Sequence, residues 1–465
     1  MMVWRSVSLW LASVCLVADW RAAVAIPLDV TNSASIKSAA STIAYGMMSY
    51  YYGNQTGNTP GNLPPPYYWW ECGAMFGHMV DYWYSTGDDT YVDETIQALD
   101  WQASKSGTFM PSNQTTTEGN DDQVFWAFAV MSAAEVNFPS PAPGYPSWLA
   151  MAQAVFNLQT TRWDLQTCGG GLRWQIFPTN NGYDYRNNAA NGGFFLLASR
   201  LARYTGNETY IKWAEKEWEW FSSSVLLDNS TWAIYDGTSD LQNCTTADHL
   251  QWSYNYGFWF AGMAYLYNHT QDEKWLTPMH GILNATLNTF FPPQMGPKIM
   301  VEIQCEPYGT CDTDDYTFKS FVMRWLAVTT QLVPSTASLI WPYIQTSAKG
   351  AAGQCDGGSN GVTCGFEWNT TVWDGLYGVG QQMSALAAVQ ANLILTDNLK
   401  PPYTTATGGT SKGDPSAGTG SGEDGGDLPA IYTRTISTSD KAGAGILTAL
   451  VLVFTLGGAA WLVVS

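Results

Sequence analysis

Apolar residues recur with helical spacing along most of the chain between Ile26 and Pro401. The pattern predicts about twelve helices. No run of alternating residues is long enough for a major sheet, and short strands are possible only inside the longer loops. The predicted helices lie at 33–50, 72–86, 91–104, 121–136, 147–160, 192–205, 208–223, 255–269, 272–289, 315–332, 335–348 and 376–394.

An internal repeat organises these helices. The segment at 84–91 (YSTGDDTY) resembles 204–210 (YTGNETY) and, more weakly, 267–275 (YNHTQDEKW). Each copy combines a helix end, a tight turn and a capped helix start. A unit of about 60 residues repeated six times would cover the domain, which predicts an all-α (α/α)6 toroid of six helical hairpins. An open helical solenoid fits less well, because no polar terminal cap is visible.

Every second predicted helix follows a loop rich in aromatic and polar residues. These loops precede the helices that begin at 72, 121, 192, 255, 315 and 376, whereas the alternate turns are short and plain. The inner helices of a toroid point their N-termini at one face, so the long loops would gather into one cleft. As sugar-binding groups in that cleft we expect Trp69, Trp70, Asn187, Asn191, Trp252, Tyr254, Asn255, Asp315, Trp373 and Asp374. Core packing of the aromatic residues and helix capping by the polar ones explain the same positions without a ligand.

Two adjacent aspartates, Asp121 and Asp122, stand at the start of the helix predicted at 121–136. Gly119 and Asn120 are turn residues and Asp121 is a candidate N-cap, so capping explains the pair without catalysis. The chemical alternative is a retaining glycosidase, which needs a nucleophilic carboxylate and a carboxyl acid/base about 5 Å apart. Neighbouring side chains that splay can reach this separation, and their repulsion would keep one of them protonated.

Two further aspartate pairs show that such pairs are not catalytic by themselves. The pair at 88–89 lies in a plain turn of the repeat and is expected to be structural. The pair at 314–315 lies in a long loop ahead of Lys319 and Arg324. It could bind sugar hydroxyls or form ion pairs with those two bases.

The composition is compatible with a carbohydrate ligand. Aromatic residues make up 14% of the chain, with 23 Trp and 25 Tyr. Sugar rings offer apolar faces for stacking and hydroxyls for Asn, Asp and Tyr, although tryptophans in a helical core would give the same composition. The net charge of −19 argues against a nucleic acid partner, whose phosphates need a basic surface.

Both ends of the chain predict export to the cell surface. Residues 1–25 have the basic start, apolar run and small-residue cleavage site of a signal peptide. A Gly/Ser/Thr-rich linker at 401–440 and a hydrophobic tail at 441–465 are typical of a glycosylphosphatidylinositol (GPI) signal, whose tail is removed. A retained tail anchor is the alternative. The small residues that could accept the anchor are Gly425, Gly426, Ser437 and Ser439. The catalytic domain would then span 26–400, GPI-anchored in the plasma membrane and/or bound in the cell wall.

Cysteines and glycosylation sequons agree with secretion. Cys15 leaves with the signal peptide, and one connectivity of the rest leaves Cys72 free, although sequence alone does not fix pairing. That connectivity is Cys168–Cys244, Cys305–Cys311 and Cys355–Cys364. The glycosylation sequons begin at Asn54, Asn113, Asn207, Asn229, Asn243, Asn268, Asn284 and Asn369.

No cofactor or metal site is expected. The four histidines show no metal-ligand spacing, and the acidic run at 312–314 lacks the Gly and Glu of a calcium loop. The segment at 409–413 (GTSKG) matches the nucleophile-elbow pattern, but it lies in the predicted linker with no strand before it. A P-loop and a dinucleotide fingerprint are both absent from the sequence.

Several blocks, in order along the chain from about 29 to 392, resemble glycoside hydrolase family 76, the α-1,6-mannanases. Within it the chain is similar to the fungal GPI-anchored "defective cell wall" branch. The blocks are 68–71 (YWWE), 120–123 (NDDQ), 187–195 (NNAANGGFF), 251–257 (QWSYNYG), 318–319 (FK), 324–325 (RW), 373–375 (WDG) and 380–383 (GQQM). Cys72 departs from the small residue expected there.

The resemblance implies an (α/α)6 fold and a retaining mechanism, with Asp121 as nucleophile and Asp122 as acid/base. For this branch it also implies a transglycosidase. The α-mannoside of a GPI glycan would form a mannosyl-enzyme and pass to cell-wall β-glucan, joining GPI proteins to the wall. The expected partners are this mannose-containing donor, the β-glucan acceptor and the membrane. Hydrolysis of α-1,6-mannan and mannan binding without catalysis are the alternatives.

Overall fold

The computed structural model describes residues 25–114 and 116–419, together with parts of a helix between 441 and 455. Most of the described chain is helical, as the periodicity predicts. The long helices are α1 (Ser33–Met48), α2 (Trp69–Thr86), α3 (Val92–Ala103), α4 (Asn120–Glu135), α5 (Trp148–Thr161), α6 (Asn188–Thr205), α7 (Glu208–Ser223), α8 (Ser253–Thr270), α9 (Leu276–Phe290), α10 (Asp315–Leu332), α11 (Ala337–Gly353) and α12 (Val379–Gln390).

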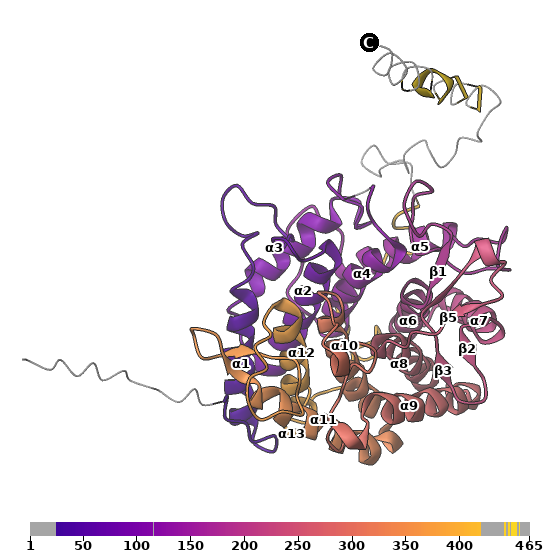
Figure 1. Ribbon diagram of the computed structural model, residues 1–465. Helices are drawn as coiled ribbons and strands as arrows, with labels where there is room; N and C mark the ends of the chain where they lie inside the picture. The colour runs from indigo at the N-terminus through magenta and orange to yellow at the C-terminus, as the bar shows by residue number, and fades with distance from the viewer. Residues whose placement is uncertain are drawn as a thin grey trace, which may run out of the picture.

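The helices form a closed toroid of two concentric rings (Figure 1). The even-numbered helices α2 to α12 form the inner ring, in which each packs against the next and α12 packs against α2. The odd-numbered helices α1 to α11 cover this ring from outside. The contact between α12 and α2 closes the ring, so the (α/α)6 prediction is confirmed and the open solenoid is wrong.

The three repeat segments share one local structure. The helices before them end at Gly87, Gly206 and Gln271, all in the left-handed region, with φ of 77°, 71° and 55°. An Asn or Asp side chain then accepts a backbone N–H two residues on, as Asn207 does from Thr209 at 2.9 Å. The 88–89 pair is part of such a turn and is structural, as expected.

Some helix boundaries differ from the prediction. The helix predicted from 192 begins at Asn188, because Asn187 already caps it by accepting the Ala190 N–H at 3.1 Å. The helix predicted at 376–394 begins only at Val379, because Gly375 and Gly378 have φ of 86° and 151°. It ends at Gln390, and a short helix, α13 (Leu393–Thr396), follows.

Short strands occur in the loops, where the sequence allowed them. β1 (Tyr185–Asn187), β4 (Gly237–Ser239) and β5 (Ala247–Asp248) form an antiparallel sheet in the order β1-β4-β5. β1 leads directly into α6 and so fixes the start of that inner helix. The two-stranded pairs are β2 (Leu227–Asp228) with β3 (Ala233–Ile234), and β6 (Cys355–Gly357) with β7 (Thr363–Cys364).

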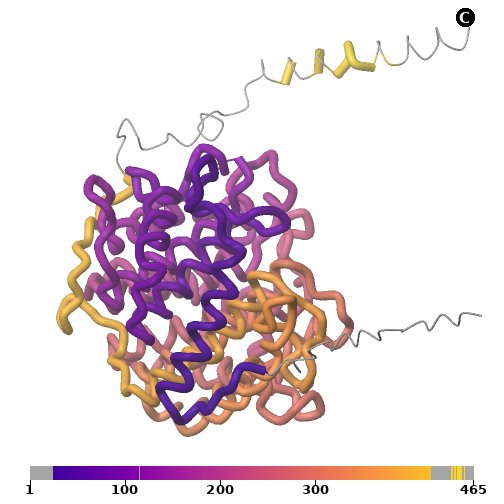
Figure 2. Tube along the Cα trace, turned by 90° about the vertical axis from the view of Figure 1, so that its left-hand side faces the viewer, coloured from indigo at the N-terminus to yellow at the C-terminus, as the bar shows by residue number. Residues whose placement is uncertain are grey.

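The predicted boundary between domain and linker at 401 is wrong. Residues 401–419 continue across the domain on the side where the inner helices end (Figure 2). The backbone N–H of Tyr403 donates to the Glu135 carbonyl at the end of α4, at 2.7 Å. That of Asp414 donates to Gln153 Oε1 on α5, at 2.6 Å. These backbone hydrogen bonds hold a Gly/Ser/Thr-rich segment in place although its side chains bury little apolar surface.

The covalent links and sequons can be located on the fold. Three disulfides join Cys168 to Cys244, Cys305 to Cys311 and Cys355 to Cys364, the connectivity considered from the sequence, and Cys72 is a buried free thiol. Among the sequons, Asn268 is only half exposed, and its Nδ2 donates to the Leu332 carbonyl at 2.9 Å. A glycan on Asn268 would disrupt this hydrogen bond, so Asn268 is the least suitable acceptor.

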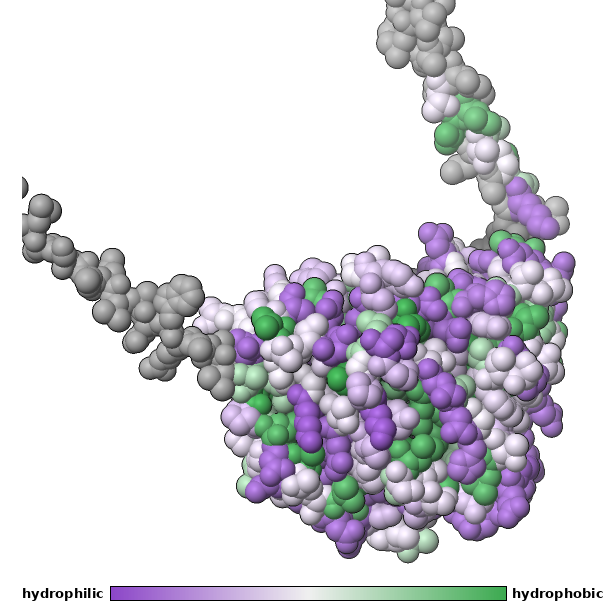
Figure 3. All heavy atoms as spheres, turned by 60° about the horizontal axis from the view of Figure 1, so that its bottom comes forward, coloured by the Kyte–Doolittle hydropathy of each residue, from purple (hydrophilic) through white to green (hydrophobic). Residues whose placement is uncertain are grey.

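The two terminal targeting segments lie largely outside the described residues. These include almost all of the signal peptide and the candidate attachment residues between 420 and 440. Where the chain is described, no helix has the length and apolar character needed to cross a bilayer. On the face turned forward in Figure 3, hydrophobic and hydrophilic residues are interspersed.

Candidate active site

A cleft of about 740 Å³ opens on the face where the inner helices begin. Its volume suits an oligosaccharide segment. The starts of α2, α4, α6, α8 and α10 and the loops before them line it, as the alternation of loops predicts, whereas the start of α12 does not. The sequence-predicted residues that line it are Trp69, Trp70, Asp121, Asp122, Asn187, Trp252, Tyr254 and Asp315.

Asp121 and Asp122 splay in different directions from the first turn of α4. Asp121 Oδ2 accepts a hydrogen bond from Asn187 Nδ2 at 2.6 Å, and its Oδ1 accepts one from the backbone N–H of Asp122 at 2.9 Å. Asp122 Oδ2 turns back to accept the Gly119 N–H at 2.6 Å. Asp122 is therefore the residue that caps the helix, with Gly119 at the N-cap, and the prediction of Asp121 as N-cap is wrong. The side chain of Asp122 therefore both caps α4 and lines the cleft.

Gly119 is required by the close approach of both carboxyl groups. A Cβ at this position would lie 2.3 Å from Asp121 Oδ1 and 3.1 Å from Asp122 Oδ2. Gly119→Ala is expected to displace the pair and lower kcat by about tenfold or more, because small misplacements of reacting groups are costly. The measurement is kcat on an α-1,6-mannoside beside the melting temperature. Unchanged kcat in the folded variant would show that the pair is not held by this contact.

Burial is the largest cause of the pKa shifts of Asp121 and Asp122. Burial, followed by the Asp122 charge, raises the pKa of Asp121 well above its ordinary value. Burial raises the pKa of Asp122 to about 6. Burial alone would leave the last shared proton on Asp121, but Asp121 accepts two N–H donors and Asp122 only one. These hydrogen bonds oppose the effect of burial by stabilising an anionic Asp121, the form that a nucleophile needs.

The raised pKa values predict how activity depends on pH. Below about pH 6 both carboxyls of the pair are protonated, and ionisation of one gives the form with one carboxylate and one acid. A retaining glycosidase needs this form, so kcat/KM should rise as the pH passes about 6 and fall again when the second proton leaves. The measurement is kcat/KM on a short α-1,6-mannoside across pH 4 to 9. A plateau already reached near pH 4.5 would contradict the effect of burial.

Aromatic rings form the walls of the cleft. The ring of Tyr254 stacks on that of Phe318 with centroids 4.0 Å apart, and Trp70 packs on Phe125 at 4.5 Å. Trp69 is held by a hydrogen bond from its Nε1 to Gln102 Oε1 at 2.7 Å. Rings fixed in this way give rigid apolar faces on which sugar rings can stack.

An acidic cluster at 312–315 forms one side of the cleft. Asp314 accepts a hydrogen bond from Trp70 Nε1 at 3.1 Å. Burial, then neighbouring carboxylates, raises the pKa of Asp314 to about 7, and burial also raises that of Asp315 to about 7. Ion pairs of the 314–315 pair with Lys319 and Arg324 are not formed, because Glu306 and Asp81 take those bases at 2.7 Å and 2.5 Å.

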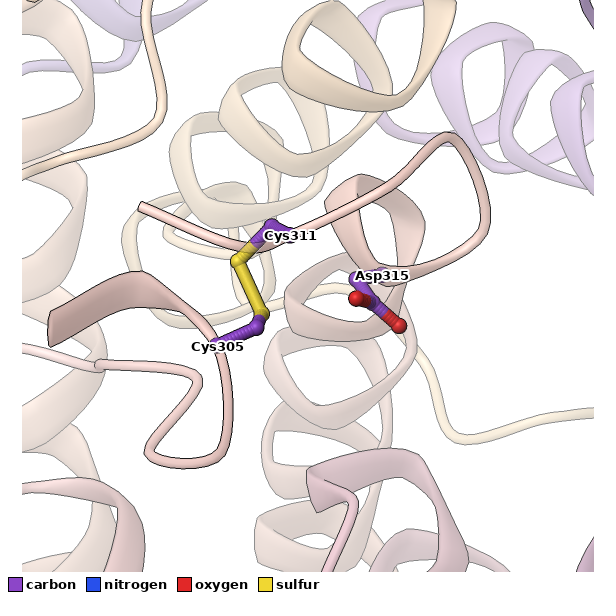
Figure 4. A group of neighbouring side chains, drawn as sticks. All are labelled: Cys305, Cys311 and Asp315. Atoms are coloured by element: carbon purple, nitrogen blue, oxygen red, sulfur yellow. A yellow bond between two sulfur atoms is a disulfide. The ribbon is translucent and has the colours of Figure 1, made fainter. Parts of the chain in front are cut away.

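The Cys305–Cys311 disulfide lies beside Asp315 (Figure 4). Their sulfur and carboxylate atoms are within 4.8 Å of one another, a spacing compatible with a metal site. Both sulfurs are bonded to each other and are no longer thiolate ligands. The disulfide therefore cross-links the loop that leads into α10.

The buried acids predict that stability falls as the pH rises. Asp314 and Asp315 have folded pKa values near 7, and burial raises that of Glu71 to about 9, above the unfolded value near 4. At a pH between the unfolded and the folded pKa values, the folded chain binds more protons than the unfolded chain. The stabilisation present at low pH is therefore lost as the pH rises through 7. We expect a melting temperature lower at pH 8 than at pH 5.5 by about 2 °C or more. Asp314→Asn should flatten this slope. A melting temperature that rises with pH would contradict the prediction.

Four predicted binding residues do not line the cleft. Asn191 is fully buried and bonds the backbone N–H and carbonyl of Leu172. Asn255 is fully buried beneath the cleft. Asp374 Oδ2 accepts the backbone N–H groups of 366 and 367, and Trp373 Nε1 donates to the carbonyl of 376. Asn191, Trp373 and Asp374 thus bond backbone groups of the loops, a role that differs from the core packing and helix capping given as alternatives for these positions.

Other residues line the cleft that the sequence did not reveal. Asp236, next to β4, is reached by the Tyr185 hydroxyl at 2.9 Å, and burial raises its pKa to about 6. Phe125 and Phe318 belong to helices whose apolar pattern indicated only core. The lining residues missed are Tyr68, Gln114, Thr117, Glu118, Phe125, Trp174, Gln175, Tyr185, Ala189, Asp236, Asp312 and Phe318. They lie in loops that have no periodic pattern, or at helix positions where an apolar residue of the cleft has the same sequence pattern as a core residue.

The ionisable side chains in the described lining of the cleft are mostly acidic, with no basic residue among them. Its described lining contains seven carboxyl groups, from Glu118, Asp121, Asp122, Asp236, Asp312, Asp314 and Asp315, and no Lys, Arg or His. A ring of hairpins with a paired carboxyl in an aromatic cleft defines a carbohydrate-active enzyme of the (α/α)6 class.

Comparison with known proteins places the chain within that class. The model of glycosyl hydrolase family 76 matches residues 35–406. The chain therefore belongs to this family and is a glycoside hydrolase. It is 48% identical over 441 residues to mannan endo-1,6-alpha-mannosidase DCW1 of Saccharomyces cerevisiae, covering 94% of this chain and 95% of that protein. It is 46% identical to mannan endo-1,6-alpha-mannosidase DFG5 of Candida albicans, covering 94% and 95%.

Solved structures of related proteins have the same fold. The crystal structure of Dfg5 from Chaetomium thermophilum in complex with glucosamine is 44% identical, with a TM-score of 0.81, and covers 84% of this chain and 98% of that one. The GH76A α-1,6-mannanase from Salegentibacter sp. HEL1_6 has a TM-score of 0.60 at 16% identity, covering 77% and 99%, which shows a shared fold.

Proposed function

We propose that this glycoside hydrolase is a retaining endo-1,6-α-mannosidase that acts as a transglycosidase at the cell surface. Its donor is the mannose core of GPI glycans or a similar α-1,6-mannan, and its acceptor is cell-wall β-glucan. The observation that carries the proposal is the splayed Asp121 and Asp122 pair in the aromatic cleft. The relatives named mannan endo-1,6-alpha-mannosidase support the donor linkage.

The two carboxyl groups have separate roles in this mechanism. Asp121, anionic and oriented by Asn187, attacks the anomeric carbon, while Asp122 gives its proton to the oxygen of the leaving sugar. The product of this half-reaction is a mannosyl ester of Asp121. In the second half Asp122 removes a proton from an incoming hydroxyl, which displaces Asp121 and restores the α-configuration.

The acidic cleft supports a donor that carries a positive charge. The cleft has no basic residue in its described lining, and those of its carboxyl groups that are ionised repel anionic sugars and attract an amino sugar. The Dfg5 from Chaetomium thermophilum binds glucosamine. A mannose-containing donor that also carries an amino sugar therefore suits this cleft better than an uncharged mannan does.

Transfer is favoured over hydrolysis by the walls of the cleft. Stacking on Trp69, Trp252 and Tyr254 would hold an acceptor sugar beside the mannosyl-enzyme more firmly than it holds water. The second candidate is a hydrolytic endo-1,6-α-mannosidase, which the relatives' names favour. Export through the signal peptide at 1–25 and anchoring through the GPI signal at 441–465 would bring the cleft to both substrates.

Product analysis with and without an acceptor tests the proposal. The protein is incubated with a GPI-type oligomannoside, alone and with laminari-oligosaccharides, and the products are separated and identified. Transfer predicts a mannosyl-glucan product that appears only with the acceptor and increases with its concentration. Release of free mannosides at the same rate under both conditions would favour the hydrolase.

A further inference from the structure

Glu118 is a buried carboxyl group of the cleft that the two-aspartate mechanism does not use. It lies three residues before Asp121, lines the cleft and is 1% exposed. Neither of its carboxyl oxygens has a hydrogen-bond partner within the part of the chain that the structure describes. A buried polar group without a partner costs free energy, so its presence at an active site calls for a ligand that completes it.

The main chain around Glu118 is held by several backbone contacts. Gly119 forms a bridge with Gln175, and the Asn120 N–H donates to the Trp174 carbonyl at 2.8 Å. The carbonyl of Glu118 itself accepts the N–H of residue 176 at 3.4 Å. These contacts tie the residues on both sides of the carboxyl to one neighbouring segment.

The charged neighbours of Glu118 are Arg162 and Asp122. Burial raises the pKa of Glu118 well above its ordinary value, the Arg162 charge opposes this, and the Asp122 charge adds to it. Arg162 Nη1 donates to Asn120 Oδ1 at 2.8 Å and to Gln123 Oε1 at 2.7 Å. The raised pKa favours the neutral form of Glu118, which offers one O–H donor and one carbonyl acceptor.

We infer that Glu118 is a third carboxyl group of the active site, which holds the attacking hydroxyl beside Asp122. This inference rests on the proposed retaining mechanism. A water molecule can donate one hydrogen to Asp122 and the other to the carbonyl oxygen of Glu118. A sugar hydroxyl can donate its hydrogen to Asp122 and accept the O–H of Glu118.

The step balances without any change at Glu118. The hydroxyl oxygen bonds to the anomeric carbon, and the bond from that carbon to Asp121 breaks and returns its electron pair to the Asp121 carboxylate. Asp122 takes the hydroxyl proton. Glu118 keeps its own proton, so it is a positioning residue. By microscopic reversibility it also contacts the leaving sugar oxygen in the first half-reaction, so a donor with a different leaving group isolates the second half.

The test uses the full-length chain and an α-mannosyl fluoride, from which fluoride departs in place of a sugar. Glu118→Leu keeps the bulk and removes the polar group. It should slow breakdown of the mannosyl-enzyme by about tenfold to a hundredfold, the factor for one hydrogen bond to a reacting group. The adduct then accumulates in the intact mass, while the initial burst of fluoride is unchanged. Glu118→Gln retains a donor and an acceptor and should restore most of the turnover.

Glu217→Leu is the matched control. Glu217 is also fully buried with both oxygens unpartnered among the described residues, but it lies on the outer helix α7. It should leave the amount of adduct unchanged. A folded Glu118→Leu that turns over at the wild-type rate without adduct would overturn the inference.

A second variant covers the case in which Glu118→Leu does not fold. Glu118→Ala leaves a space the size of a small carboxylic acid, and added formate should restore turnover in proportion to its concentration. Absence of rescue in the folded variant would also overturn the inference. If the wild-type chain forms no adduct and inverts the anomeric centre, the retaining mechanism fails first. If it only hydrolyses but the Glu118 effect persists, transfer fails and the inference stands.

Discussion

Asp121→Asn is expected to lower kcat by about 10⁴-fold or more on every α-mannoside, the usual cost of removing a nucleophile. The amide keeps the size of the side chain but cannot form the glycosyl ester. Because Asp121 is one of a buried pair with raised pKa values, removing its charge should raise stability slightly. The measurements are kcat and the melting temperature of the same preparation.

Asp122→Asn is the matched control for these roles. It should be nearly inactive on mannobiosides, whose leaving sugar needs a proton, yet form the glycosyl ester with a fluoride leaving group. Added azide should then turn the ester over, because azide attacks without a general base. If both variants lost the first step equally with the fluoride donor, the separate roles assigned to Asp121 and Asp122 would be refuted.

Arg200→Met is expected to lower the free energy of unfolding by about 3–5 kcal/mol, because it leaves a buried carboxylate without its counter-charge. Arg200 Nη2 and Glu135 Oε2 are 2.7 Å apart, and both side chains are almost fully buried. They line a cavity of about 90 Å³ at the ends of α4 and α6, beneath the segment 399–402. Denaturant unfolding measures the change.

Two controls give this prediction its specificity. Lys274→Met breaks an exposed pair with Glu215 at 2.7 Å and should cost less than about 0.5 kcal/mol. Replacing both Arg200 and Glu135 by methionine should restore much of the lost stability, because no unpaired charge remains buried. Equal losses for Arg200→Met and Lys274→Met would show that burial of the Arg200 pair has no special weight.

The fold could be predicted from the sequence because each level of pattern agreed. Apolar periodicity marked the helices, and the turn chemistry that ends at Gly87 and Gly206 marked the repeat. The segment 401–419 was misplaced because composition indicates a linker, whereas its backbone hydrogen bonds to α4 and α5 are invisible in sequence.

The candidate site was predictable only in part, for a physical reason. Residues at the first turn of an inner helix, such as Trp70 and Asp121, reach the cleft because of where that turn lies. Asn191 lies one turn into α6 and bonds the buried backbone of Leu172 instead of reaching the cleft. Residue type alone does not distinguish a position that reaches the cleft from one that is buried beside it. Asp236 enters through an insertion between α7 and α8, whose return to the cleft depends on the pairing of β4 with β1.

Trapping of the glycosyl-enzyme tests the central claim most directly. The protein is treated with a slowly hydrolysed fluorinated α-mannosyl fluoride, digested, and the modified peptide is sequenced by mass spectrometry. We expect a single ester on Asp121, in the peptide that also contains an unmodified Asp122. An ester on Asp122, or no ester together with a product of inverted anomeric configuration, would contradict it.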